Sequence, residues 1–370
     1  MKIVILVSYT YPYIGSGIGQ VALLQAEGLV KLGNEVILVS SNIPVTKKKF
    51  TKNGVLHLKI NSLNFLDKFD IPVPLFFLNR EVISHIKTAD IVHSHDMLYP
   101  HSLLAALTAR RFGKPFVLTQ HAGFISYPSR LTNFLQFLTN KTMGRLVLKL
   151  SDQIIVVNEE VKNWLGKAGR RTATLMNGVD TSLFHPVTKK IKMEIRRKYG
   201  LPLNKKIVLY VGRLVLKKGF QRLFEVRSDN YLTVFVGGGK VPKSMADEKG
   251  NVLFLGALSQ DKLSEVYQAS DVFVLPSDCE GFPLSIQEAM ASGLPIITTK
   301  HPGFEKYLDG RFVKFILPTK QAVRRAILEV LRNKGMRDSM IEYSLKTTTI
   351  KASWENNIKN LLKIYKKAFL

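Results

Sequence analysis

Residues 1–39 read MKIVILVSYTYPYIGSGIGQVALLQAEGLVKLGNEVILV, and they decide the expected fold class. The β-branched run Met1–Val7 predicts a buried strand, and a glycine-rich turn follows it. A helical pattern then covers Gln20–Leu32, and a second apolar run covers Glu35–Val39. Strand, glycine loop, helix and strand in this order are typical of a βαβ unit in a parallel sheet.

The same alternation continues along the chain and then restarts. Further strands are predicted at Ile91–His93, Phe116–Thr119, Ile154–Val157 (the last of the first half), Lys206–Val211, Thr233–Val236, Val252–Leu255, Asp271–Leu275 and Ile296–Thr298. Two Rossmann-like α/β domains are therefore expected, 1–175 and 176–350, followed by a C-terminal helix in 351–370. Because ligands of open parallel sheets bind beyond the carboxyl ends of the strands, the site is expected in a cleft between the halves.

Length and composition limit the class of protein. A chain of 370 residues exceeds what one hydrophobic core usually serves. Its one cysteine, Cys279, excludes an intrachain disulfide and a cysteine-based metal site. No segment approaches the roughly 18 apolar residues of a membrane span, and Ile3–Val7 is too short for a signal-peptide core. The protein is expected in the cytoplasm.

The formal charge of +26 comes from 54 basic and 28 acidic residues. Such an excess favours polyanions, although a lysine-rich proteome would produce the same balance. The lysines are spread along the chain without a nucleic-acid motif, so no nucleic-acid partner is expected. Our hypothesis is docking to the anionic inner face of a membrane, where a lipid-linked or glycan acceptor is bound.

Two carboxylates mark the strongest chemical pattern, the segment 280–288, which reads EGFPLSIQE. It follows the predicted strand Asp271–Leu275 and opens a helix, whose first backbone N–H groups can receive an anion or a sugar hydroxyl. Glu280 precedes the helix and Glu288 lies one to two turns inside it, so the pair can hold hydroxyls of two rings. The simpler alternative is that both acids only complement the helix dipole.

A basic pair follows the strand Lys206–Val211. Gly212-Arg213 ends that strand, and Lys218-Gly219 comes five residues later. An arginine fork and a lysine ammonium at a strand end suit a diphosphate. A solvated basic loop is the simpler alternative in so cationic a chain.

These motifs together resemble the donor domain of family 4 glycosyltransferases, which are retaining enzymes of the GT-B fold. The resemblance rests on Arg213 to Gly219, Phe254-Leu255-Gly256, the run from Tyr267 to Ser277, and the run from Glu280 to Pro295. It extends to the N-terminal glycine loop, 92–96 (VHSHD), 119–121 (TQH) and 177–180 (NGVD). It implies that the C-terminal helix packs back on the first, acceptor-binding domain.

The resemblance also implies roles for individual residues. Arg213 and Lys218 would neutralise the departing diphosphate of a UDP- or GDP-sugar, which makes an essential metal unnecessary. Gly15 and Gly17 would let the backbone approach that diphosphate, and His121 would lie beside the sugar. Glu288 would bind the ribose hydroxyls, and Glu280 the transferred sugar. The remaining donor-binding residues would be Gly281, Phe282, Pro283 and Leu284.

Retention requires either a double displacement or attack from the leaving-group face. Because the family has no agreed nucleophile, Glu280 is assigned to positioning the sugar rather than to covalent attack. Several residues depart from the family pattern: Ser16 between the loop glycines, Pro302-Gly303 for a glycine pair, and Glu305-Lys306, where the acid comes one place early.

Other patterns have simpler interpretations. The segment Phe124–Leu150 can place Leu131, Phe134, Leu135 and Leu138 on one helical face, which we expect to be ordinary core rather than a membrane-facing surface. His93, His95 and His101 have one aspartate nearby, Asp96, and packing is expected rather than metal binding. Trp354, ahead of an amphipathic terminal helix (Ile358, Leu361, Leu362, Tyr365), is expected to anchor that helix.

Three other functions compete with glycosyl transfer. A dinucleotide-dependent enzyme is disfavoured because the loop lacks a third glycine and Ser40-Ser41 replaces the expected acid. A sugar-nucleotide epimerase would keep the fold but would not need the two pairs Glu280/Glu288 and Arg213/Lys218. A non-catalytic basic protein that binds membranes or nucleic acid remains an alternative, because fold does not prove function.

Overall fold

The chain folds into two compact units. The computed structural model describes residues 1–10, 17–43, 47–63, 73–74, 79–124, 129–239, 241, 245, 250–278, 283–301, 304, 308–351 and 353–369. Unit 1 is Met1–Asn177 with Trp354–Leu370, and unit 2 is Gly178–Ser353. The chain thus changes unit after residues 177 and 353, where the sequence interpretation placed boundaries after residues 175 and 350.

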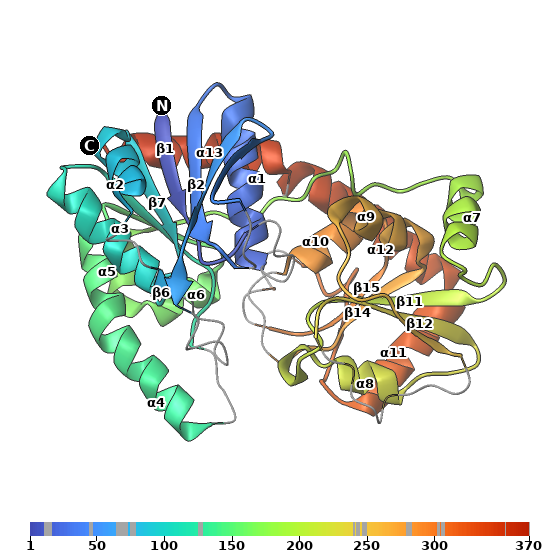
Figure 1. The fold of residues 1–370 in the computed structure, drawn as a ribbon. Helices are drawn as coiled ribbons and strands as arrows, with labels where there is room; N and C mark the ends of the chain where they lie inside the picture. The colour runs from blue at the N-terminus through green and yellow to red at the C-terminus, as the bar shows by residue number, and fades with distance from the viewer. Residues whose placement is uncertain are drawn as a thin grey trace. The chain divides into compact units, whose positions relative to one another are not determined.

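Unit 1 is built around a mostly parallel sheet. Its described part contains eight strands in the order β10-β9-β8-β7-β1-β2-β4-β3, of which only β3 runs antiparallel to its neighbour (Figure 1). The strands are β1 (Lys2–Leu6), β2 (Glu35–Ser41), β3 (Lys49–Lys52), β4 (Val55–Ile60), β7 (Ile91–His95), β8 (Phe116–Gln120), β9 (Gln153–Val156) and β10 (Thr172–Thr174), and β5 (Ser62–Leu63) pairs separately with β6 (Val73–Pro74). The β-branched runs lie at the sheet centre because helices cover both faces there.

One strand prediction in this unit is wrong. Ile154–Val157 was expected to be the last strand, but β10 pairs in parallel with β9 beyond it. The run Thr172–Thr174 is short and partly exposed, so it carries no strong apolar signal.

The C-terminal helix α13 (Trp354–Lys367) returns to unit 1, as predicted (Figure 1). Its Ile358 and Tyr365 join the core cluster of β1 and α1. Gly28 of α1 makes this packing possible, because a Cβ there would lie 2.6 Å from Ile358 Cγ1. A glycine inside a helix costs about 1 kcal/mol relative to alanine, and here it permits close helix contact.

The other helices of unit 1 are α1 (Gly17–Lys31), α2 (Arg80–Thr88), α3 (Pro100–Arg111), α4 (Arg130–Thr139), α5 (Arg145–Leu150) and α6 (Glu159–Trp164), with the π-helical turn η3 (Asn140–Gly144) and the 3-10 turn η4 (Gly166–Arg171).

The expectation that the apolar face of α4 is core is wrong, since α4 has no buried residue. No described helix has the length and apolarity needed to cross a bilayer.

Unit 2 repeats the plan with a parallel sheet. In its described part six strands follow the order β13-β12-β11-β14-β15-β16. They are β11 (Lys206–Val211), β12 (Tyr231–Val236), β13 (Val252–Phe254), β14 (Val272–Leu275), β15 (Ile296–Thr299) and β16 (Lys314–Ile316). Its helices are α7 (Lys189–Lys198), α8 (Phe220–Glu225), α9 (Gln260–Ala269), α10 (Leu284–Ala291), α11 (Lys320–Arg332) and α12 (Lys334–Lys351), with the 3-10 turn η5 (Leu216–Lys218).

Candidate functional site

The carboxyl ends of β11 and β14 form the core of the candidate site in unit 2. The two strands are parallel neighbours, with Leu209 paired to Phe273, so the segments that leave them start at one edge of the sheet. Arg213 follows β11, and the Tyr210 hydroxyl donates a hydrogen bond to its carbonyl oxygen at 2.9 Å. The Leu214 N–H donates to the Gly238 carbonyl at 2.9 Å, which ties this turn to the end of β12.

The turn that carries Lys218 is attached to the segment after β14. The Asp278 N–H donates to the Lys217 carbonyl at 2.8 Å, and Arg222 pairs with Asp278 at 2.7 Å. Gly219 has a φ of +70°, and a Cβ on it would lie 1.9 Å from the Pro276 carbonyl oxygen. Only glycine fits this contact, so the basic turn lies directly against the segment leading to Glu280.

Glu288 is a buried carboxylate on α10, with 6% of its surface exposed. The Tyr267 hydroxyl of α9 lies 2.9 Å from Glu288 Oε2 and donates to it. Burial raises the pKa of Glu288 to about 7, although the Tyr267 hydrogen bond acts in the opposite direction. A carboxylate kept in so apolar a place is expensive, which is typical of binding sites rather than of helix-dipole compensation.

The structure describes part of the predicted donor-binding set. Pro283 and Leu284 stand at the start of α10, directly before and at its first residue. Glu280, Gly281, Phe282 and the first loop glycine, Gly15, lie outside the described residues. Cys279 lies outside the described residues as well. So do the positions that depart from the family pattern: Ser16, Pro302, Gly303, Glu305 and Lys306.

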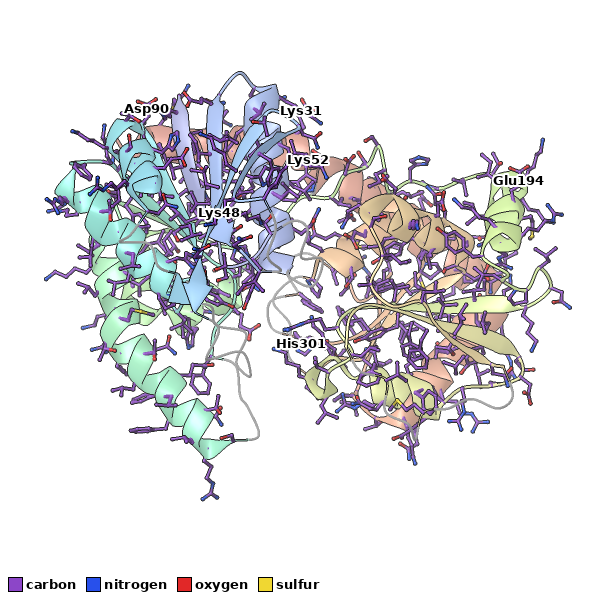
Figure 2. All side chains as sticks on the ribbon, viewed as in Figure 1. Lys31, Lys48, Lys52, Asp90, Glu194 and His301 are labelled. Atoms are coloured by element: carbon purple, nitrogen blue, oxygen red, sulfur yellow. The ribbon has the colours of Figure 1, made fainter. Side chains whose placement is uncertain are left out.

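His301 was not singled out from the sequence, yet it lies at the same edge of unit 2, after β15 (Figure 2). The Thr299 hydroxyl donates to the Ser277 carbonyl, so the His301 Nε2–H must donate to Thr299 Oγ1, 2.8 Å away. The ring packs edge-on against Phe304. The available signal was its place three residues after the predicted strand Ile296–Thr298, next to Pro302-Gly303, which departs from the family pattern.

In unit 1, His121 belongs to a row of three histidine rings at the carboxyl ends of β7 and β8, in which His93 and His95 are buried and His121 is half-buried. His121 Nε2 lies 2.8 Å from His95 Nδ1, and the His95 ring is tilted against that of His93, with the ring centroids 4.5 Å apart. His93 contacts Tyr365 Oη and Thr119 Oγ1, each at 2.7 Å. The terminal helix therefore supports the row that ends at His121.

Burial keeps these histidines neutral. It lowers the pKa of His93 to about 3 and of His121 to about 4, and that of His95 well below its usual range. Between two neutral rings one nitrogen donates and the other accepts, so the tautomer of His95 determines whether His121 Nδ1 is an acceptor or a donor. His121 can thus form a hydrogen bond with a sugar hydroxyl without adding charge.

These histidines do not make a metal centre in the described part of the chain, where no group of three or more His, Cys, Asp or Glu side chains could hold an ion. His93, His95 and Asp96 are buried. Burial raises the pKa of Asp96 to about 6, while hydrogen bonds from Leu98 and Gln120 favour its ionised form.

Lys59 of β4 is a second residue that the sequence interpretation did not single out. It is 3% exposed, and its ammonium donates to Ser40 Oγ at 2.9 Å and to the Thr10 carbonyl at 3.3 Å. Thr10 directly precedes the glycine loop, and Gly17 after that loop begins α1. The signal was a lysine in the run Val55–Ile60, where it alternates with apolar residues and His57.

Burial lowers the pKa of Lys59 from 10.5 to about 8. Between these values the unfolded chain holds more protons than the folded chain, so the free energy of unfolding rises with pH. We expect this group to add about 3 kcal/mol between pH 8 and pH 10.5. Denaturant unfolding of the natural chain and of Lys59→Met at both pH values measures the difference. An equal pH dependence of stability in the two proteins would contradict this expectation. Loss of the pH dependence in Lys47→Met, a control at an exposed lysine, would contradict it as well.

Comparison with known proteins gives a consistent result for both units. The family model described as Glycosyltransferase Family 4 matches residues 15–183, and the model described as Glycosyl transferases group 1 matches residues 191–347. TuaC of Bacillus subtilis (strain 168), named for teichuronic acid biosynthesis, is 32% identical over 238 residues, which are 63% of this chain and 58% of TuaC. The chain therefore spans less than two thirds of that relative.

Two other proteins match along nearly the whole chain. The D-inositol 3-phosphate glycosyltransferase of Corynebacterium urealyticum is 25% identical over 413 residues, covering 99% of this chain and 95% of the relative. The structure of Anabaena HepE in complex with UDP and glucose aligns with a TM-score of 0.79 at 16% identity, over 99% of both chains. Its likeness shows the shared GT-B fold. The chain is therefore a glycosyltransferase of the GT-B fold and belongs to family 4, the glycosyl transferases group 1.

Proposed function

We propose that the protein is a retaining glycosyltransferase that moves a sugar from a UDP- or GDP-sugar to an acceptor. One observation carries the donor assignment: the basic turn from Arg213 to Lys218 is hydrogen-bonded to the segment that leads from β14 to α10. That helix bears the buried Glu288. Cations for a diphosphate and a carboxylate for ribose hydroxyls thus start from adjacent strands, and HepE has been solved with UDP-glucose.

The roles follow from the chemistry of each group. The glycosidic bond to the diphosphate breaks as negative charge develops on the leaving group. Arg213 and Lys218 stabilise that charge, because fixed cations lower the energy of a transition state most where negative charge develops in it. Glu288 accepts hydrogen bonds from the ribose hydroxyls, and Glu280 with Gly281, Phe282 and Leu284 holds the transferred sugar. His121, a neutral ring, hydrogen-bonds a sugar hydroxyl, and Gly15 and Gly17 leave room for the diphosphate.

Unit 2 is accordingly proposed to bind the donor and unit 1 the acceptor. We assign no covalent nucleophile, and Glu280 is kept as a positioning residue. Two basic side chains do the work that a metal does in other transferases, so no metal is required. The acceptor is proposed to be lipid-linked or a glycan, used in glycolipid, polysaccharide or glycan assembly at the inner face of the cytoplasmic membrane, and no nucleic acid is involved.

A donor screen tests the activity. The chain is incubated with UDP-, GDP- and ADP-sugars, with and without membrane extract as a source of acceptor, and free nucleoside diphosphate is measured. We expect release from a UDP- or GDP-sugar that the extract stimulates and that a metal chelator leaves unchanged. The anomeric configuration of the product, read by NMR, should equal that of the donor. Absence of release from every donor by a folded chain would favour a non-catalytic binding protein.

A further inference from the structure

Helix α4 of unit 1 exposes an apolar surface that the fold does not use. The exposed fractions are 67% for Leu131, 60% for Phe134, 46% for Leu135, 51% for Phe137 and 47% for Leu138. Figure 1 shows α4 extending away from the sheet of its unit. An amphipathic helix of a globular protein normally buries this face. Here the face remains on the surface of the unit that carries it.

The exposed residues form a stripe rather than a scatter. Leu131, Phe134, Leu135 and Leu138 follow the spacing i, i+3, i+4 and i+7, which places them on one side of a helix. The helix continues through η3 into α5, where Leu146 is 41% exposed. Exposed apolar residues elsewhere, such as Leu32, Leu107 and Leu317, lie singly on different parts of the chain. Single residues need no explanation, but a contiguous stripe marks an interaction surface.

The charge around the stripe is of one sign. Between Asp96 and Asp152 the sequence contains no acidic residue, while its basic residues are Arg110, Arg111, Lys114, Arg130, Lys141, Arg145 and Lys149. The last four lie on α4, η3 and α5 and are exposed. The Lys141 ammonium lies 5.4 Å from the centre of the Phe137 ring, directly beside the stripe. Apolar side chains edged by lysine and arginine match the interface of an anionic bilayer.

We propose that α4, with its continuation into α5, is the surface on which the protein docks to an anionic lipid bilayer. The stripe enters the boundary between head groups and acyl chains, and the basic residues bind the lipid phosphates. This inference rests on the proposed function, since it supplies the contact that brings unit 1 to a lipid-linked acceptor. A second copy of the chain that packs α4 against α4 is disfavoured, because two segments of the same positive charge would repel each other.

Vesicle co-sedimentation of the full chain tests the inference. Vesicles of phosphatidylcholine alone are compared with vesicles that also contain phosphatidylglycerol, at about physiological salt. We expect at least about tenfold stronger binding to the anionic vesicles, since each basic residue near the surface contributes about fivefold. Leu131→Ser/Phe134→Ser should lose about tenfold or more of that binding. The control Leu32→Ser/Leu107→Ser, which replaces two exposed leucines outside α4, should bind as the natural chain does.

Separate measurements keep docking apart from catalysis. The α4 variant should still release nucleoside diphosphate from donor in the absence of membranes, because no proposed donor residue lies on α4. Vesicle binding that depends on α4 without any donor turnover would contradict the proposed function and leave docking in place. Binding that is absent, or equal for the α4 variant and its control, would overturn docking. Docking would also be overturned if the chain formed a dimer through α4 and did not bind vesicles.

Discussion

Replacing Glu288 by glutamine is expected to weaken donor binding by about 100-fold or more. The carboxylate is proposed to accept hydrogen bonds from two ribose hydroxyls, and hydrogen bonds to a charged group contribute about 1.5–3 kcal/mol each. Glutamine has one acceptor oxygen and turns an N–H group toward the second hydroxyl. The side chain is buried on α10, so bulk solvent has little access to compensate for the lost hydrogen bond.

The pH dependence should change in the same variant. Because the pKa of Glu288 is about 7, donor affinity of the natural chain should fall about tenfold per pH unit below that value, as the carboxylate takes up a proton. The pKa of Glu288 in the folded chain exceeds the ordinary value of 4.5, so between pH 4.5 and pH 7 the folded chain holds more protons than the unfolded chain. The free energy of unfolding therefore falls by about 3 kcal/mol as pH rises from 4.5 to 7. Glu288→Gln removes this loss and should be more stable at pH 8.

Donor titration by calorimetry at pH 6 and pH 8, with denaturant unfolding at both values, measures these effects. The control is Glu265→Gln, an acid of α9 that pairs with Lys198 and lies away from α10. It should keep the donor affinity and pH profile of the natural chain. Unchanged affinity in Glu288→Gln, or a pH profile that survives the substitution, would remove Glu288 from the donor site.

Replacing Lys218 by alanine is expected to slow sugar transfer by about 100- to 1000-fold while donor affinity changes far less. The diphosphate gains negative charge as the glycosidic bond breaks, so a cation held near it stabilises the transition state more than the ground state. The turn around Gly219 holds Lys218 in place through its contact with Pro276. A flexible surface lysine would not give this separation of rate from binding.

Single-turnover rates and donor dissociation constants for Lys218→Ala separate the two effects. Lys262→Ala, an exposed lysine at the start of α9, is the control and should match the natural chain in both. Lys218→Arg should recover part of the rate, because the charge is kept although its shape changes. A loss confined to the dissociation constant, with an unchanged rate at saturation, would contradict the assignment to the leaving group.

Apart from β4, strands whose side chains are buried on both faces were predictable to within two residues. β11 was predicted without error at Lys206–Val211, and β14 differs from the predicted Asp271–Leu275 by one residue at its start. These elements carry unbroken apolar runs between turn residues, and such runs depend little on distant contacts. Their order along the chain also placed Arg213 and Lys218 after β11.

Two features were missed or misjudged for different reasons. The hairpin β3–β4 turns on Asn53 and Gly54, both at positive φ, a local signal that was available in the sequence. The exposure of α4 was not available, because an apolar stripe looks the same whether or not another element covers it. Only the position of the rest of unit 1 decides that question.

The sequence by itself determined the alternation of strands and helices, the glycosyltransferase family and the residues at strand ends, since these depend on local patterns and on motif order. The tertiary structure alone decided which groups lose water. It buried Glu288 beside Tyr267, joined His121 through His95 and His93 to the terminal helix, and placed the Lys59 ammonium beside the Thr10 carbonyl. The pKa of an ionisable group depends on burial and on neighbours far away in the sequence, so no reading of adjacent residues could supply it.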